Sequence, residues 1–258
     1  MKRLSVFIYG LACYAVFFAT FLYAIGFIGN LIVPKSIDSV PQAPLGTALV
    51  INLLLLGVFA VQHSLMARPF FKRWWTRIIH PAAERSTYVL FSSLALILLF
   101  ALWEPMGGVI WSLESPAGQW AAHAAYAFGW GLVLFSTCAI NHFDLFGLRQ
   151  TWAYARGREP EPLKFVQPWI YRVVRHPLYV GWFFVMWATP TMTVAHLVFA
   201  LGTSIYMLVA IQFEEHDLQN AHPEYRDYKK RVPMLIPSLK RLFGTGDDAS
   251  ATEVAKHS

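Results

Sequence analysis

Long apolar runs constrain this chain more than any other feature of its sequence. Each approaches the ~20 residues that a helix needs to cross the hydrocarbon core of a bilayer. They are apolar on all sides, whereas a surface helix of a soluble protein carries a polar face. The runs are Leu4 to Ile28, Leu45 to Met66, Thr87 to Trp103, Trp120 to Ile140 and the longer stretch Leu178 to Phe213. The sequence therefore predicts an integral membrane protein.

The predicted fold class is all-α. Backbone polar groups in lipid must be satisfied inside a helix or a closed barrel, and the sequence lacks the alternating segments of barrel strands. The first run exceeds the roughly 7–15 residues of a signal-peptide core, so we expect it to be the first transmembrane helix. Only 14% of the residues are charged, against about 25% in soluble domains.

The distribution of positive charge predicts the topology. With Lys2 and Arg3 on the cytoplasmic side, 20 of the 21 Lys and Arg residues fall on that side and only Lys35 falls outside, as the positive-inside rule requires. The net charge of +6 is then a membrane signal and predicts no nucleic-acid partner. Both termini are expected to be cytoplasmic, so Leu178 to Phe213 must cross and return. This gives four spans plus a C-terminal helical hairpin.

The first arm of this hairpin is too short to span. Residues 178–189 would rise only ~18 Å as a helix. We expect the arm to begin earlier, near Pro168, and to be broken by Pro177 at the cytoplasmic boundary. After the hairpin, Glu214 to Arg231 is expected to continue as a charged helix with a turn at Pro223. Arg68 to Arg85 is expected to form an aromatic surface helix at the headgroup level.

The densest cluster of polar side chains lies around this break. Arg175 and His176 precede Pro177, and Glu214 and Glu215 stand where the hairpin returns. A structural interpretation is a basic helix end with aromatic residues in the interfacial belt. However, two adjacent carboxylates at a membrane boundary are costly next to lipid and require cations. The hairpin would supply them, forming a mixed-charge pocket.

A second cluster leaves the fourth span at Asn141-His142-Phe143-Asp144. Its structural interpretation is a helix exit with Asn and Asp as caps. In an active-site interpretation, His142 lies near the reacting groups and Asp144 orients or charges it. His142 could then act as a base, as could a hydrogen-bonding tyrosine. His63 either lines the pocket or makes a structural hydrogen bond. His196 should lie on the outer side, so that its replacement is nearly silent.

Glycines and cysteines within the spans are expected to serve packing. Gly129-Trp130-Gly131 is predicted to be a helix-packing site and not a cofactor loop. Cys13 and Cys138 suggest neither a disulfide framework nor a Cys-based metal site.

The Arg-His-Pro-x-Tyr-x-Gly motif at 175–181 resembles the signature of the isoprenylcysteine carboxyl methyltransferase and phospholipid methyltransferase superfamily. The resemblance continues through Glu214-Glu215 and the segment 225–233. Elsewhere, from Tyr9-Gly10 through 141–147 to Pro237, the chain is similar to the NnrU/nurim branch and its methanethiol S-methyltransferases. An arginine shortly before the glutamate pair in the prenylcysteine enzymes is missing here, which suits a small substrate without a carboxylate.

The resemblance implies methyl transfer from S-adenosylmethionine to the sulfur of methanethiol, on the cytoplasmic side of a bacterial inner membrane, with membrane lipids as surroundings. It implies a single domain over 1–243, with the cofactor site mainly in 141–237. The segment 244–258 is expected to be a disordered tail, because it is small, polar and acidic. No metal is required, because the sulfonium already activates the methyl group. Expected catalytic residues are His142, Asp144 and Tyr179; expected cofactor-binding residues are Arg175, His176, Pro177, Tyr179, Gly181, Glu214, Glu215, Tyr225 and Tyr228.

Two alternative functions fit the same sequence. In the first alternative, the methyl group is transferred to a lipid or a prenylcysteine. In the second, the chain is a haem-binding membrane isomerase in which His63 and His142 are axial ligands.

Overall fold

The computed structural model describes residues 2–159 and 168–237. Within these ranges, the helices long and apolar enough to cross a membrane are α1 (Lys2–Gly29), α2 (Leu45–Ala67), α4 (Pro81–Leu102), α5 (Pro116–Ile140) and α9 (Val194–Ala221). The shorter elements are α3 (Pro69–Trp75), β1 (Val109–Ser112), α6 (His142–Leu145), α7 (Leu148–Ala155), η1 (Trp169–Arg172), α8 (Pro177–Trp187), β2 (Thr191–Thr193) and α10 (Tyr225–Arg231). The predicted all-α membrane fold is confirmed, while the expected tail 244–258 lies outside the described residues.

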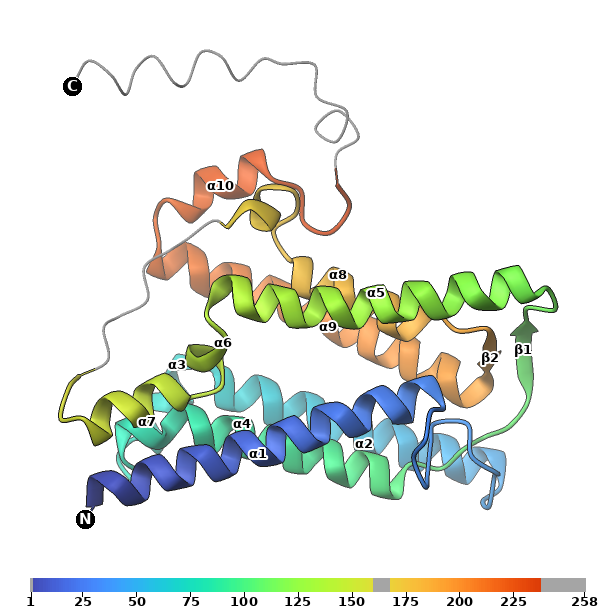
Figure 1. The fold of residues 1–258 in the computed structure, drawn as a ribbon, viewed down its shortest axis with the longest axis horizontal. Coiled ribbons are helices and arrows are strands. Elements are labelled where there is room, and N and C mark those ends of the chain that lie inside the picture. Colours follow the sequence, from blue (N-terminus) through green and yellow to red (C-terminus); the bar gives the residue numbers. More distant parts are fainter. Residues whose placement is uncertain (1, 160–167, 238–258) are drawn as a thin grey trace.

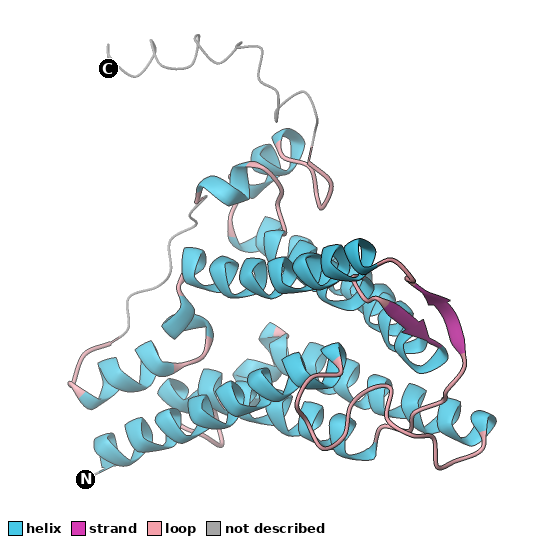
Figure 2. Ribbon diagram, turned by 45° about the vertical axis from the view of Figure 1, so that its right-hand side comes forward, coloured by secondary structure: helices cyan, strands magenta, loops and turns pink. Residues whose placement is uncertain are grey.

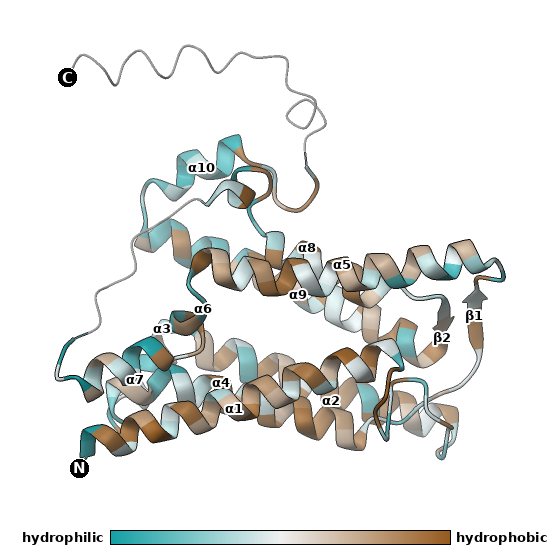
Figure 3. Ribbon diagram, viewed as in Figure 1, coloured by the Kyte–Doolittle hydropathy of each residue, from teal (hydrophilic) through white to brown (hydrophobic). Residues whose placement is uncertain are grey.

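The helices form two layers (Figures 1 and 2). In one layer, α4 packs against α1, α2 and α7; in the other, α8 packs against α5 and α9. A contact between α2 and α9 joins the layers. The hydrophilic start of α1, α7 and α10 lie toward the same end of the molecule, and hydrophobic residues dominate the long helices (Figure 3). This is the end that the sequence assigns to the cytoplasm.

The predicted C-terminal hairpin is confirmed, but its first arm begins later than expected. Helix α8 has 11 residues and therefore rises about 16 Å. It starts at Pro177, because proline is favourable in the first turn of a helix and disfavours a helical conformation in the residue before it. His176 accordingly has a non-helical backbone, with φ −126° and ψ 63°. Between Pro168 and Pro177, only the short η1 turn is helical. The expectation of a helix that begins near Pro168 was therefore wrong.

Two glycines allow α5 and α8 to approach closely. A Cβ atom at Gly129 would lie 2.8 Å from the carbonyl oxygen of Gly181, and a Cβ at Gly181 would lie 2.8 Å from that of Gly129. Contacts this short cannot be made without moving backbone. The expected packing role is confirmed for Gly129, whereas a Cβ at Gly131 would meet nothing within 4 Å.

The opposite end of the bundle departs from the purely helical prediction. Strands β1 and β2 pair antiparallel there, because the loops between α4 and α5 and between α8 and α9 meet at this end. The strands have only 4 and 3 residues, too few to show a pattern beside the long apolar helices in the sequence.

His196 is also at this end and is 1% exposed. Its Nε2 lies 2.9 Å from the carbonyl oxygen of Met186, and its Nδ1 lies 3.7 Å from Asp38 Oδ2. Burial raises the pKa of the Asp38 carboxyl, but the nearby His196 imidazole and hydrogen bonds from Thr193 and Asn30 outweigh burial and hold that pKa below its usual value. His196 lies at the end of the bundle where it was expected, and its burial predicts a structural role.

Candidate active site

The candidate site lies where the start of α8, the end of α9 and α10 meet. The backbone N–H of Arg175 donates to the carbonyl of Pro233 at 2.8 Å, and that of His176 donates to Met234 at 3.2 Å. The non-helical residues before Pro177 are thus paired with the segment that follows α10. This pairing satisfies backbone groups that the break in the helix leaves open.

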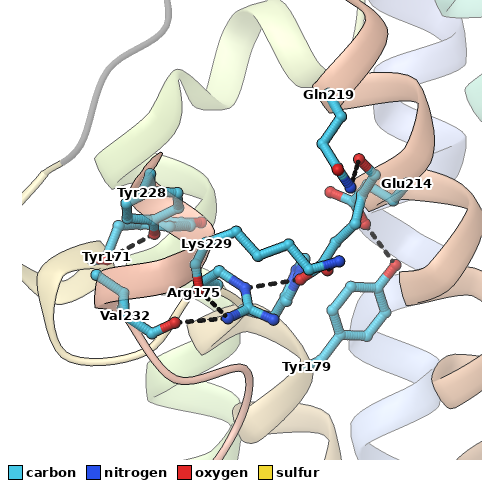
Figure 4. A network of polar contacts seen from close by, with 10 residues as sticks. Tyr171, Arg175, Tyr179, Glu214, Gln219, Tyr228, Lys229 and Val232 are labelled. Carbon is cyan, nitrogen blue, oxygen red and sulfur yellow. Dashed lines mark hydrogen bonds and ion pairs between the residues drawn. The ribbon is translucent and has the colours of Figure 1, made fainter. Parts of the chain in front are cut away.

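Glu215 is the centre of a buried ionic network, and Figure 4 shows Arg175 and Lys229 of this network. Its carboxylate lies 2.7 Å from Arg175 Nε, 2.7 Å from Lys229 Nζ and 3.0 Å from His176 Nε2, and its side chain is 2% exposed. Arg175 also donates to the carbonyl oxygens of Lys229 at 3.1 Å and Val232 at 2.5 Å. A carboxylate this buried needs such partners. The network consequently fastens α8, α9 and α10 together.

Glu214, by contrast, is lightly paired. Its Oε2 accepts a hydrogen bond from the hydroxyl of Tyr179 at 3.0 Å, and no other hydrogen bond or ion pair of this carboxylate occurs in the part of the chain that the structure describes. A carboxylate can accept about four hydrogen bonds. Glu214 therefore retains the capacity to bind a ligand, while the adjacent Glu215 is already paired with three cationic or hydrogen-bonding side chains.

The two tyrosines of α10 form a packing cluster. Tyr225 and Tyr228 are buried against Val232 and Leu218, and the Tyr228 hydroxyl donates to the carbonyl of Tyr171 at 2.6 Å. Burial raises the pKa of Tyr228 to about 12. Burial and the nearby Glu215 carboxylate likewise raise the pKa of Tyr225. Both phenols are neutral near pH 7, and they hold α10 against the ionic network.

The second predicted cluster is arranged differently from the expectation. His142 Nε2 lies 2.8 Å from the Tyr14 hydroxyl, and its Nδ1 lies 2.9 Å from Thr137 Oγ1. The Asp144 carboxylate instead lies 3.3 Å from Arg149. The expectation that Asp144 orients His142 is therefore wrong. Burial lowers the pKa of His142, so its imidazole is neutral near pH 7.

A third set of polar residues was largely missed from the sequence. The Tyr88 hydroxyl lies 2.9 Å from His63 Nε2, and Tyr206 Oη lies 3.2 Å from Ser64 Oγ. Tyr206 lies on α9, the helix that also carries Glu214 and Glu215. The polar run around His63 within a span was a usable signal. Nothing in the sequence separates Tyr88 and Tyr206 from the other aromatic residues of the spans.

Comparison with known proteins identifies the family. The chain is 58% identical over 240 residues to "Methanethiol S-methyltransferase" of Crocosphaera subtropica, covering 93% of this chain and 94% of that protein. It is 53% identical to "Methanethiol S-methyltransferase" of Mycobacterium tuberculosis, covering 92% and 98%. Nurim of Bos taurus is 33% identical over 180 residues, covering 66% of this chain and 68% of nurim. No family model and no solved structure matches the chain.

The fold and these relatives first define a class, the multispanning membrane proteins related to nurim. Within that class, the chain belongs to the methanethiol S-methyltransferase family. It is thus a member of an enzyme family whose reaction requires a methyl donor and a thiol acceptor, as the sequence resemblance implied.

Proposed function

We propose that this chain transfers a methyl group from S-adenosylmethionine to the sulfur of methanethiol, giving dimethyl sulfide and S-adenosylhomocysteine. The observation that carries the proposal is the difference between the two adjacent glutamates. The Glu215 carboxylate is paired with Arg175, His176 and Lys229. The Glu214 carboxylate accepts a hydrogen bond from one phenol and is available to a ligand. The names of relatives at 45–58% identity agree with this reaction.

The side chains present suit the methyl donor. S-adenosylmethionine carries an ammonium group and ribose hydroxyls, which Glu214 can bind by charge-assisted hydrogen bonds. Lys229, 39% exposed at its side chain, and His176 supply positive charge and a donor for its carboxylate. Tyr179 orients Glu214. When bound, the donor supplies a methyl group already activated on a sulfonium.

In this assignment, several expected cofactor-binding residues shape the site without contacting the donor. Arg175 and Glu215 neutralise each other in the framework, Pro177 begins α8, and Tyr225 and Tyr228 pack α10 in place. We further place the site at the cytoplasmic face of a bacterial inner membrane, because the basic segments gather at that end of the bundle.

The acceptor must lose a proton, since a thiolate is the nucleophile. An alkyl thiol titrates above the ~8.5 of cysteine, so ionising it at pH 7 costs on the order of 2–5 kcal/mol. His142 is one candidate to receive this proton, because its lowered pKa keeps it neutral. Both of its ring nitrogens already have hydrogen-bond partners.

The test uses membranes containing the full chain, labelled S-adenosylmethionine and methanethiol, with dimethyl sulfide measured in the headspace. Glu214→Gln should abolish labelled product and weaken S-adenosylhomocysteine binding. The matched control is Glu224→Gln, because Glu224 has a 57% exposed side chain and should tolerate the change. Folded wild-type protein that forms no dimethyl sulfide would refute the acceptor. Label transferred to lipid or to a prenylcysteine, or a haem absorption band, would favour the alternatives.

A further inference from the structure

Lys35 has no role in the proposed reaction, and its position in the chain is unusual. Of the 21 Lys and Arg residues, 20 fall in the segments assigned to the cytoplasmic side, whereas Lys35 stands in the loop between α1 and α2. This loop lies toward the end of the molecule that carries β1 and β2, away from α10 (Figure 1). A lone cation on this side runs against the positive-inside pattern, so its surroundings indicate what it binds.

A groove of about 420 Å³ lies between α1 and α4. Helix α1 lines it from Val16 to Tyr23, and α4 lines it from Ile97 to Ala101. The stretch of α1 covers two turns, or about 10 Å. Ala19 and Ala101 are small and exposed, while Phe100 is buried. The groove is therefore open toward the surroundings of the bundle and closed on the side of the core.

The lining of the groove suits a hydrocarbon chain. Both hydroxyl groups in it are already used, because Thr20 donates to a carbonyl of its own helix at 2.7 Å and Tyr23 donates to the carbonyl of Lys35 at 3.0 Å. The neighbouring Leu22 and Leu98 are 51% and 43% exposed, so this face of the bundle meets lipid. In a bilayer an acyl chain fills such a groove, since an empty space would forfeit van der Waals contacts.

Lys35 lies at one end of this groove. Its ammonium donates to the carbonyl of Ala101 at 2.9 Å, and its own carbonyl accepts the hydrogen bond from Tyr23. Ala101 and Tyr23 both line the groove. The bond to Ala101 also satisfies a carbonyl that the end of α4 leaves open. This structural role uses one of the three ammonium hydrogens and leaves two for a ligand.

The charge of Lys35 is not balanced by a carboxylate. No ion pair of Lys35 occurs within residues 2–159 and 168–237. The Asp38 carboxylate, three residues further on, is bonded instead to Asn30 and Thr193. A Lys at a membrane surface attracts anionic headgroups, and a phosphate accepts charge-assisted hydrogen bonds. Because the groove begins beside the ammonium, one lipid molecule can supply both the phosphate and the acyl chain.

We propose that Lys35 and the groove between α1 and α4 bind an anionic phospholipid. Its phosphate accepts hydrogen bonds from the Lys35 ammonium, and one of its acyl chains lies along the groove. A zwitterionic phospholipid also fits the groove, but its own cation offsets the attraction between its phosphate and Lys35. The inference requires only the membrane fold, and it holds whether or not the proposed methyl transfer is correct.

The test uses the full chain in nanodiscs of phosphatidylcholine. Each sample contains photoactivatable phosphatidylglycerol or phosphatidylcholine with a diazirine in the same acyl chain, and mass spectrometry maps the crosslinked residues. In the wild type, phosphatidylglycerol should label 16–23 and 97–101 about fivefold more than phosphatidylcholine at equal mole fraction, the ratio expected for one Lys near a membrane surface. Label on Leu53 and Leu54, which are exposed on α2, should not distinguish the two lipids.

Variants separate the charge from the groove. Lys35→Gln should abolish the preference for phosphatidylglycerol, because its amide can donate to Ala101 but carries no charge. Lys35→Arg should retain the preference. Ala19→Trp should fill the groove and reduce the label there from both lipids. Ala12→Trp, at an exposed position two turns away on the same helix, is the matched control and should label as the wild type does.

Equal labelling of the groove by both lipids in the wild type would overturn the inference. So would a preference for phosphatidylglycerol that survives in Lys35→Gln. Crosslinks between two copies of the chain through α1 and α4, without lipid label in the groove, would show that a second copy covers this face and would also overturn it. Failure of the proposed function is distinguishable, because these readouts do not use turnover.

Discussion

Two adjacent glutamates should respond in opposite ways to the same substitution. Glu215→Gln removes the charge that balances Arg175, whose side chain is 9% exposed, and leaves that guanidinium buried beside His176. Removing one partner of a buried pair costs about 3–5 kcal/mol. The lower end applies here, because Lys229 can turn to solvent and Arg175 keeps its two carbonyl partners. Glu214→Gln alters one hydrogen bond to Tyr179, which is worth about 1 kcal/mol.

The loss in Glu215→Gln should appear locally, because Arg175 and Lys229 connect α10 to the rest of the site. A cost of about 3 kcal/mol corresponds to roughly two orders of magnitude in the opening equilibrium of α10. Hydrogen exchange read by mass spectrometry should show that acceleration in residues 225–231 and little change in α4. Glu214→Gln should leave exchange in α10 within about tenfold of the wild type.

Ligand binding should show the reverse order. Glu214→Gln should weaken S-adenosylhomocysteine binding by about 10–100-fold, the value of a hydrogen bond to a charged group. The reasoning is refuted if Glu214→Gln exposes α10 as much as Glu215→Gln does. It is equally refuted if Glu215→Gln leaves exchange in α10 unchanged.

Three further predictions concern the framework. Gly129→Ala should destabilise by about 1–3 kcal/mol through overpacking against α8, and thermal unfolding in detergent should show Gly131→Ala as neutral. Asp38 has a lowered pKa, so its stabilisation is complete above about pH 4 and is lost as the pH falls further; Asp38→Asn should flatten this acid limb of a stability–pH curve. His196→Ala should cost about 1–3 kcal/mol, because a buried carbonyl loses its partner. His123→Ala, at an exposed position, should leave the melting temperature unchanged.

The spans and the hairpin were predictable because they depend on apolar length and on the side that carries Lys and Arg. The meeting of Arg175 with Glu215 followed from the hairpin alone. The side of each helix that packs against its neighbours could not be predicted in the same way. A helix that is apolar all round has no polar stripe to set its rotation, so nothing in α4 indicated that Tyr88 turns toward His63 of α2.

Other differences have a similar origin. The sequence could not distinguish Glu214 from Glu215, because neighbouring residues on a helix point about 100° apart and only packing decides which one meets the cations. Asp144 was assigned to His142 from sequence proximity. In the structure it contacts Arg149, one turn further along the chain.

The pairing of Arg175 and His176 with Pro233 and Met234 has a consequence for biosynthesis. Helix α8 is too short to cross a bilayer by itself, so we expect it to enter the membrane together with α9. The ionic network then awaits α10, and its backbone support awaits the residues after it. The site is thus completed only as the last described segment leaves the ribosome. A ribosome that stops near residue 225 releases a protein that has every long helix of the described residues and lacks the proposed methyl-donor site.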